Sequence, residues 1–196
     1  QEATALPGML ASCRKQGLRV FGGIFPALIH DGVRHDTGLV AIPLPADSRV
    51  AADLTGQPRW AWQNDLPDAA DDRHGSVIIL TDCMAPNISG LLEQVYDHFG
   101  NAASYVGGGA GFQDLRREPC IFTEQGLLPH AAVVALTPEQ TSVGARHGWK
   151  RMSEPFVASR TEGNVIHELN WEPAGEFYRR QVAALNPALA GRPVFP

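Results

Sequence analysis

The segments from Ser76 to Thr81 and from Ile88 to Phe99 constrain the fold most. The first is a continuous apolar run, which is typical of a central strand covered on both faces. The second repeats apolar residues at i, i+3, i+4, i+7, i+8 and i+11, which predicts an amphipathic helix. Asn87 is placed to cap this helix and Gly100 to end it. We therefore expect a sheet with a helix packed on it.

Shorter predicted elements surround this pair. Pro7–Gln16 predicts a helix that ends at Gly17, and Pro173 opens a helix that carries Tyr178. Asp47–Gly75 predicts a surface loop, with Trp60 and Trp62 packed onto the body. The further strands that the pattern predicts are Leu18–Ile24, Gly38–Leu44, Cys120–Thr123, Ala131–Leu136, Val143–Trp149, Phe156–Ser159 and Val165–Leu169.

Tight turns join many of these strands. Turn residues occur at Asp31-Gly32, Gln125-Gly126 and Glu162-Gly163-Asn164, and each favours a hairpin. Hairpins join antiparallel strands. The sequence therefore predicts a fold that contains both helices and strands (α/β), in an arrangement closer to the α+β class. Its sheets are expected to be mixed and largely antiparallel, with packed helices.

The composition excludes several classes of protein. With 196 residues, 44% of them hydrophobic, the chain is long enough for one domain, or one domain and part of another. A net charge of −5 without a Lys/Arg run argues against nucleic acid as a partner. The apolar runs are too short for insertion into a membrane, and no signal peptide is recognised. Three cysteines without a CxxC pair indicate a reducing compartment, so we expect a cytoplasmic protein.

The glycine-rich segment from Tyr105 to Phe112 has two interpretations. It lacks the Gly-Lys-Ser/Thr of a P-loop, and no clear helix follows it as in a dinucleotide-binding turn. Glycines occur where the backbone needs a positive φ or where side chains would block close packing. Glycines also let backbone N–H groups approach a ligand. The residues alone leave both interpretations open.

Histidines and cysteines offer few catalytic or metal-binding patterns. No HxH or HExxH pair occurs among the seven histidines, so we expect no bound metal or haem. A single histidine as axial haem ligand, in a gas sensor, is an alternative. Cys83 follows the buried strand at a helix start, where a thiol pKa is lowered, so a small hydrolase or transferase is a second alternative. Asp36-Thr37-Gly38 is interpreted as a polar turn rather than a protease triplet.

The order of four motifs resembles the FIST domain, a bacterial intracellular sensory domain. The motifs are the glycine-rich Gly107–Gly111, Gly148-Trp149, the hairpin Gly163–Leu169, and Pro173-Ala174 followed by Tyr178. Gly22–Pro26 resembles a glycine-containing strand end of the same family. Asn170-Trp171-Glu172 departs from the Asp-Gly that is common before Pro-Ala, so no carboxylate role is carried over to that position.

The resemblance implies a domain organisation and a function. Residues 1–150 correspond to an N-terminal-type module, and residues 151–196 to the truncated start of a C-terminal-type module. The implied function is intracellular sensing of a small ligand, such as an amino acid or similar metabolite, for a signalling partner such as a kinase or cyclase. No catalytic residue is implied, so we expect no enzyme activity.

The resemblance favours a ligand-facing role for the glycines, and we predict one ligand site where the glycine-rich segment meets the predicted strand that carries His147 and Trp149. Its residues are Gly107, Gly108, Gly109, Ala110, Gly111, Phe112, His147, Gly148 and Trp149. Uncovered backbone N–H groups of the glycines are expected to take a carboxylate, and Arg116 and Arg117 to add positive charge. On a strand, His147 and Trp149 would share one face and supply a polar contact beside an aromatic wall.

Overall fold

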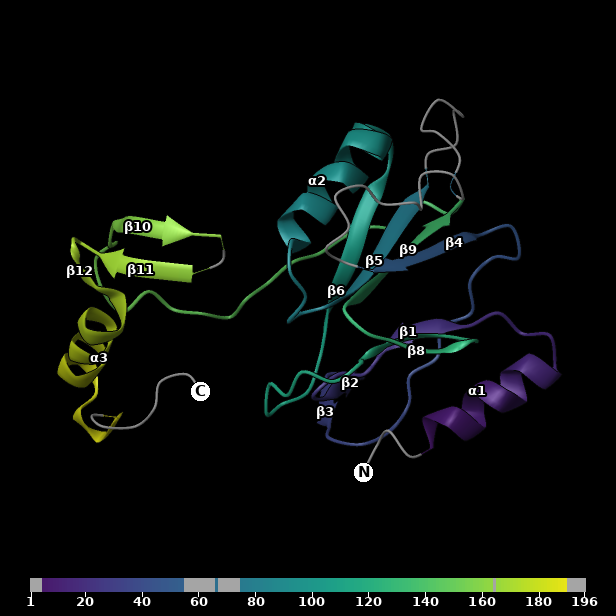
Figure 1. The fold of residues 1–196 in the computed structure, drawn as a ribbon, viewed down its shortest axis with the longest axis horizontal. Coiled ribbons are helices and arrows are strands. Elements are labelled where there is room, and N and C mark those ends of the chain that lie inside the picture. Colours follow the sequence, from purple (N-terminus) through teal and green to yellow (C-terminus); the bar gives the residue numbers. More distant parts are fainter. Residues whose placement is uncertain (1–4, 55–65, 67–74, 164, 190–196) are drawn as a thin grey trace. The chain divides into compact units, whose positions relative to one another are not determined.

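The structure is a computed structural model that describes residues 5–54, 66, 75–163 and 165–189 (Figure 1). Contacts divide the chain into two compact units, residues 1–144 and residues 145–196. Each unit is described by itself. The described residues form three α-helices and twelve strands in mostly antiparallel sheets, which confirms the predicted fold class.

A mixed four-stranded sheet forms the centre of the first unit. Its strand order is β4 (Arg49–Leu54), β9 (Ala131–Thr137), β5 (Ser76–Asp82) and β6 (Ser104–Ala110). Strand β9 is antiparallel to both β4 and β5, whereas β5 and β6 are parallel. The parallel pair is possible because helix α2 (Ile88–Phe99) and the short 3-10 helix η3 (Gly100–Ala102) form the crossover between its strands. The predicted strand at Ser76–Thr81 and the predicted helix at Ile88–Phe99 are both confirmed.

Helix α2 packs on one face of this sheet, as its periodicity predicts (Figure 1). Leu91, Val95 and Phe99 are at most 3% exposed and contact Val77 and Val134 on the strands. Burying an apolar side chain of this size contributes about 1.5–3 kcal/mol. The helix is therefore held mainly by the packing of its apolar stripe.

The predicted side-chain cap of α2 is wrong. Asn87 adopts a left-handed backbone with φ +59° and makes no side-chain capping hydrogen bond. Its side chain lies against Gly90 instead, where a Cβ atom would be 2.5 Å from Asn87 Oδ1. Asn tolerates the left-handed region better than most residues, which explains why it occupies this position.

A second, antiparallel sheet covers the other face of the central sheet. It contains β1 (Phe21–Gly23), β7 (Ile121–Thr123) and β8 (Gly126–Leu128) in that order. Ile121 of this sheet and Val133 of β9 are both fully buried in the shared core. Helix α1 (Leu6–Lys15) adds Leu6 and Leu10, which pack against Phe122. The central sheet is thus sandwiched between α2 and β1-β7-β8 (Figure 1).

The hairpin predicted at Asp31-Gly32 is confirmed. Strands β2 (Leu28–His30) and β3 (Val33–His35) pair antiparallel around two residues with φ +51° and +74°. Positive φ at both central residues is the condition for the two-residue turn that matches strand twist.

Two predictions between residues 38 and 75 are wrong. Gly38–Leu44 forms no strand, and Ile42 is 77% exposed. Strand β4 begins at Arg49, within the stretch for which a loop was predicted, because β9 supplies a pairing edge. Trp60 and Trp62 lie outside the described residues.

The second unit contains a small antiparallel sheet and a helix. Strands β10 (Ala158–Glu162), β11 (Val165–Leu169) and β12 (Glu172–Pro173) pair in that order, which confirms the predicted hairpin; its Asn164 lies outside the described residues. Helix α3 (Ala174–Leu185) buries Phe177, whose ring meets that of Phe156 edge-on at 4.8 Å between centroids. A short 3-10 helix, η4 (Pro187–Leu189), follows.

The glycine-rich segment is a strand, not a loop. Residues 107–109 lie within β6 and pair with residues 79–81 of β5. A Cβ atom on Gly107 would lie 1.9 Å from the Ile79 carbonyl oxygen, which is backbone and has no alternative rotamer. A Cβ atom on Gly108 would meet nothing within 4 Å. The β5–β6 pairing therefore requires a glycine at position 107 but does not require one at position 108.

We predict that Gly107→Ala and Gly108→Ala differ sharply in stability. Gly107→Ala should lower the free energy of unfolding by more than about 2 kcal/mol, since the new methyl group overlaps the Ile79 backbone. Gly108→Ala should change it by less than about 0.5 kcal/mol, since its methyl group enters open space. Urea unfolding followed by circular dichroism measures both. Equal stability of the two variants would contradict the assigned register.

Candidate functional site

Two of the glycine motifs meet in the first unit. The N–H group of Gly111 donates to the Ile24 carbonyl oxygen at 2.8 Å, and the Ile24 N–H group donates to the Cys120 carbonyl oxygen at 2.7 Å. A Cβ atom on Gly23 would lie 2.8 Å from Ala110 Cβ, so a glycine is needed for this close approach. The end of β1 is thereby joined to the end of β6.

A cleft of about 570 Å³ opens beside this junction. The segments after β1, β3 and β6 line it, with residues Ile24–Pro26, Asp36, Phe112, Gln113, Asp114 and Arg116. Its size lies in the range of small-molecule sites. Half of its lining residues are apolar and half are polar or charged. All lining residues belong to the first unit.

Arg116 is the basic side chain of this lining, and carboxylates already neutralise it. Its guanidinium carbon lies 3.7 Å from the centroid of the Phe112 ring. Its Nη1 atom is 3.0 Å from Asp114 Oδ2, and its Nε atom is 3.2 Å from Glu118 Oε2. Hydrogen bonding to Arg116 lowers the pKa of Asp114, so this carboxyl group stays ionised.

Backbone N–H groups near the cleft are also engaged. Gly111 donates to Ile24, as described above, and Leu115 N–H donates to the Phe112 carbonyl oxygen at 3.1 Å. The Arg116 N–H group donates to Asp114 Oδ1 at 3.4 Å. The expected carboxylate cradle of uncovered N–H groups is therefore not available at these three positions.

A buried polar group lies at the end of β5, close to the glycines. Asp82 is 5% exposed and accepts a hydrogen bond from the Met84 N–H group at 2.8 Å. Its Oδ2 atom is 3.7 Å from Nδ1 of His130. The Cys83 Cβ and Sγ atoms occupy the space that side chains on Gly109 and Gly111 would need, at 2.8 and 2.7 Å. These two glycines therefore make room for the cysteine.

The two thiols near Asp82 are held in their protonated form. Partial burial of the largely exposed Cys83, and then the negative charge of Asp82, raise the pKa of its thiol. The same causes raise the pKa of Cys120 to about 12. A thiol nucleophile needs a lowered pKa, so the sign of the Cys83 shift is the opposite of the one the hydrolase alternative requires.

The structure places the predicted site residues in two separate groups. Gly107, Gly108, Gly109 and Ala110 are in β6, and Gly111 and Phe112 follow it. Of these six residues, Phe112 lines the cleft. His147, Gly148 and Trp149 belong to the second unit.

The strand predicted at Val143–Trp149 is wrong. These residues carry no strand pairing, and the Trp149 N–H group donates to His147 Nδ1 at 2.9 Å. Gly148 has φ +66°, in the left-handed region that glycine adopts without strain. The Trp149 side chain is 84% exposed, so the residue is a surface aromatic and not a core residue.

Sequence reasoning missed most of the cleft. Ile24–Pro26 were matched to the family motif, and Asp36 was interpreted only as part of a turn. Nothing in the sequence connects residue 24 with residue 111, because a backbone hydrogen bond makes the connection. The spacing of Asp114 and Arg116 could have indicated their ion pair, because opposite charges at positions i and i+2 of a turn can meet, as these two do.

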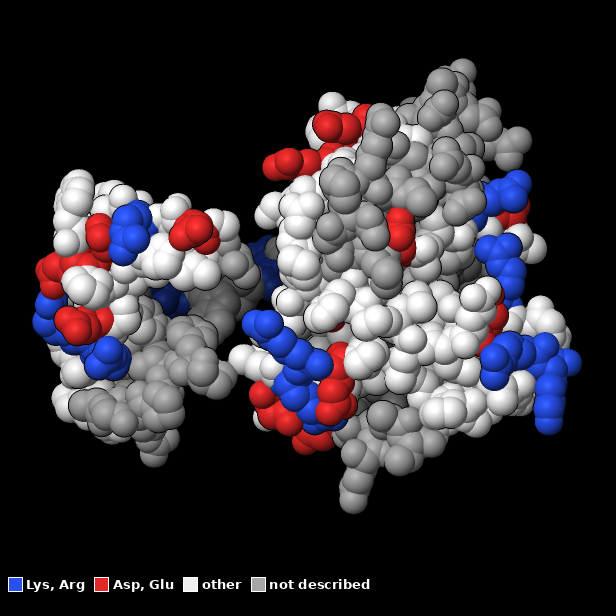
Figure 2. Space-filling view, viewed as in Figure 1, with Lys and Arg blue, Asp and Glu red and all other residues white. Residues whose placement is uncertain are grey.

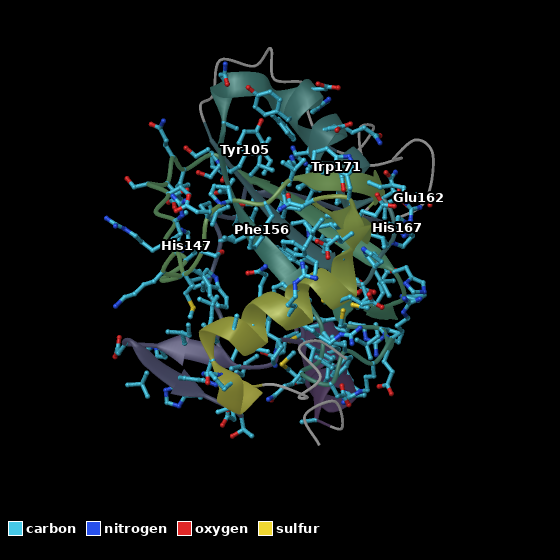
Figure 3. The ribbon with its side chains drawn as sticks, turned by 90° about the vertical axis from the view of Figure 1, so that its left-hand side faces the viewer. Tyr105, His147, Phe156, Glu162, His167 and Trp171 are labelled. Carbon is cyan, nitrogen blue, oxygen red and sulfur yellow. The ribbon has the colours of Figure 1, made fainter. Side chains whose placement is uncertain are left out.

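The second unit carries its own polar pairs. Glu172 accepts two hydrogen bonds from the Arg180 guanidinium group, at 2.7 and 3.0 Å. Figure 3 shows Glu162 and His167 beside each other on the β10–β11 hairpin, with 3.5 Å between Oε2 and Nε2. These pairs join neighbouring elements of the unit and are partly exposed, so each contributes little to stability.

Comparison with known protein families shows to which family the chain belongs. A family model described as the FIST N domain matches residues 2–172. The chain belongs to the FIST family. FIST domains are sensory domains of signal transduction and are not known as enzymes. Searches of curated proteins and of solved structures returned no match.

The part of this FIST protein that the structure describes contains neither a helix suited to a membrane nor a cluster of metal ligands. In residues 5–54, 66, 75–163 and 165–189, no helix combines the length and the apolar character that crossing a membrane requires. Within the same part of the chain, no group of three or more His, Cys, Asp or Glu side chains is arranged to hold a metal ion.

We predict that Cys120 resists alkylation in the folded protein. With its pKa at about 12, the Cys120 thiol stays protonated at about pH 8.5 and is also buried. Iodoacetamide should leave Cys120 unmodified in native protein but label it in urea, which mass spectrometry of tryptic peptides measures. The exposed Cys83 serves as the comparison. Rapid native labelling of Cys120 would show that the Asp82 end of β5 opens readily.

Proposed function

We propose that this FIST protein is a cytoplasmic sensory module that binds a small metabolite and passes the signal to a partner such as a kinase or cyclase. Family membership supports the sensory role. The observation that carries the ligand-binding proposal is the cleft beside Phe112, because it forms where the two glycine motifs meet. Amino acids and similar metabolites have a size that suits a cleft of about 570 Å³.

The proposed binding residues remain those predicted from the sequence, in two groups. In the first unit, Gly107–Gly111 position the end of β6 so that Phe112 forms one wall of the cleft. In the second unit, His147, Gly148 and Trp149 are exposed, and the Trp149 ring offers an uncovered aromatic surface. We further propose that residues 151–196 begin a C-terminal-type module. Each group is tested separately.

We predict that Phe112→Ala abolishes ligand binding. The parent protein should show a rise in melting temperature with one or more members of an amino-acid panel, and micromolar binding corresponds to about −8 kcal/mol. At a hundredfold excess over Kd the stabilisation is about 2.7 kcal/mol, or about 5–11 °C for a domain of this size. Phe112→Ala should remove this shift because it removes one wall of the cleft.

Two further variants make the result specific. Ile42→Ala removes an exposed apolar side chain that does not line the cleft, and it should bind like the parent. Trp149→Ala tests the group in the second unit by the same measurement.

Native mass spectrometry of freshly purified protein identifies any metabolite that is retained. A shift that persists in Phe112→Ala would place the site away from the cleft.

A further inference from the structure

We propose that the cleft beside Phe112 selects a ligand with a positively charged amine and an apolar body, rather than a carboxylate. This proposal rests on the proposed ligand-binding function and names the chemical class of the ligand. It replaces the anion expected from the sequence, where Arg116 and Arg117 suggested local positive charge.

The charges of the lining favour a cation. Asp36 and Asp114 both line the cleft, and both are carboxylates. Arg116 is the basic side chain among the same lining residues, and Asp114 and Glu118 already share its guanidinium group. An added anion would compete with two carboxylates for one guanidinium group, whereas an added ammonium group meets an excess of acceptors.

The ion pair between Asp36 and Arg34 does not remove the excess of carboxylates in the lining. Arg34 Nε lies 3.0 Å from Asp36 Oδ1, and both side chains are largely exposed. Arg34 and Glu118 do not line the cleft; among the residues that do, the two carboxylates of Asp36 and Asp114 face the one guanidinium group of Arg116. Figure 2 shows this mixture as basic and acidic side chains gathered together near the β2–β3 hairpin.

Arg117 is a second basic residue near the cleft, and its charge can be removed as a control. It follows Arg116 in the sequence, but it does not line the cleft. If the ligand were an anion drawn by this basic pair, removing the Arg117 charge would weaken binding. If the ligand is an amine, removing that charge leaves binding unchanged or slightly stronger.

The walls of the cleft suit an apolar body next to the charge. Ile24, Phe25 and Pro26 form one wall, and Phe112, which is 7% exposed, lies on another. The Phe112 ring already carries the Arg116 guanidinium group on one face at 3.7 Å. Because Arg116 already covers the Phe112 ring, Phe25 supplies the aromatic ring that remains for a ligand cation.

Three probes of matched shape test the charge preference. They are 2-phenylethylamine (a cation), 3-phenylpropionate (an anion) and phenylalanine (a zwitterion). Isothermal titration calorimetry on the full chain should show that the amine binds at least tenfold more tightly than the anion. The amine should bind about five- to tenfold more weakly to Asp36→Asn and to Asp114→Asn, since each variant removes a lining carboxylate.

Matched controls separate the cleft from the rest of the surface. Asp47→Asn removes an exposed carboxylate that does not line the cleft, and Arg117→Gln removes the neighbouring charge. Neither should weaken amine binding. Thermal melts of all variants check that the fold is retained. We expect Asp36→Asn and Asp114→Asn to fold, because both side chains are largely exposed.

The outcomes distinguish this proposal from the proposed function. Tighter binding of 3-phenylpropionate that Phe112→Ala abolishes would overturn the charge preference but leave the cleft as the ligand site. Amine binding that Asp36→Asn and Asp114→Asn leave unchanged would overturn the proposal by placing the amine elsewhere. Failure of all three probes to bind would also overturn it. The proposed function would then be judged by whether the parent protein retains a metabolite that Phe112→Ala loses.

Discussion

The pairing of β6 with β5 is the contact on which the rest of the first unit depends. It is possible because Gly107 has no side chain to meet the Ile79 carbonyl oxygen. Once β6 lies in this register, Ala110 accepts a hydrogen bond from the Cys83 N–H group, and Gly111 reaches Ile24. The cleft beside Phe112 exists because the contact between Gly111 and Ile24 brings the segments after β1 and β6 together.

The sequence predicted best those elements whose signal is local. The apolar run at β5 and the helical period of α2 identify them without reference to any other segment. Strand β6 was not among the predicted strands because glycines have low strand propensity and the pairing partner, β5, lies elsewhere in the chain. Val143–Trp149 shows the reverse case, since its alternation suits a strand but no neighbouring strand pairs with it. Pairing partners, rather than propensity, decide both cases.

The chemistry of the candidate site was harder to predict than its location. The resemblance named both glycine motifs, and Phe112 at the end of the second motif does line the cleft. The adjacent Arg116 and Arg117 suggested an anion site, because charge was counted along the chain. In the structure, Asp114 and Glu118 both pair with the Arg116 guanidinium group, so the expected charge of the ligand changes from negative to positive. A sensor of this kind would then respond to a ligand class that its basic residues do not indicate.

Gly107 also bears on how related sequences are interpreted. A position that excludes every Cβ atom is kept as glycine by selection for folding alone, whatever the ligand. Such a position would stay invariant among relatives that sense unrelated molecules, and invariance there would carry no information about specificity. The residues expected to diverge with the ligand are those that line the cleft, such as Asp36 and Gln113. Subgroups of the family are therefore better separated by these lining positions than by the glycines that define the motif.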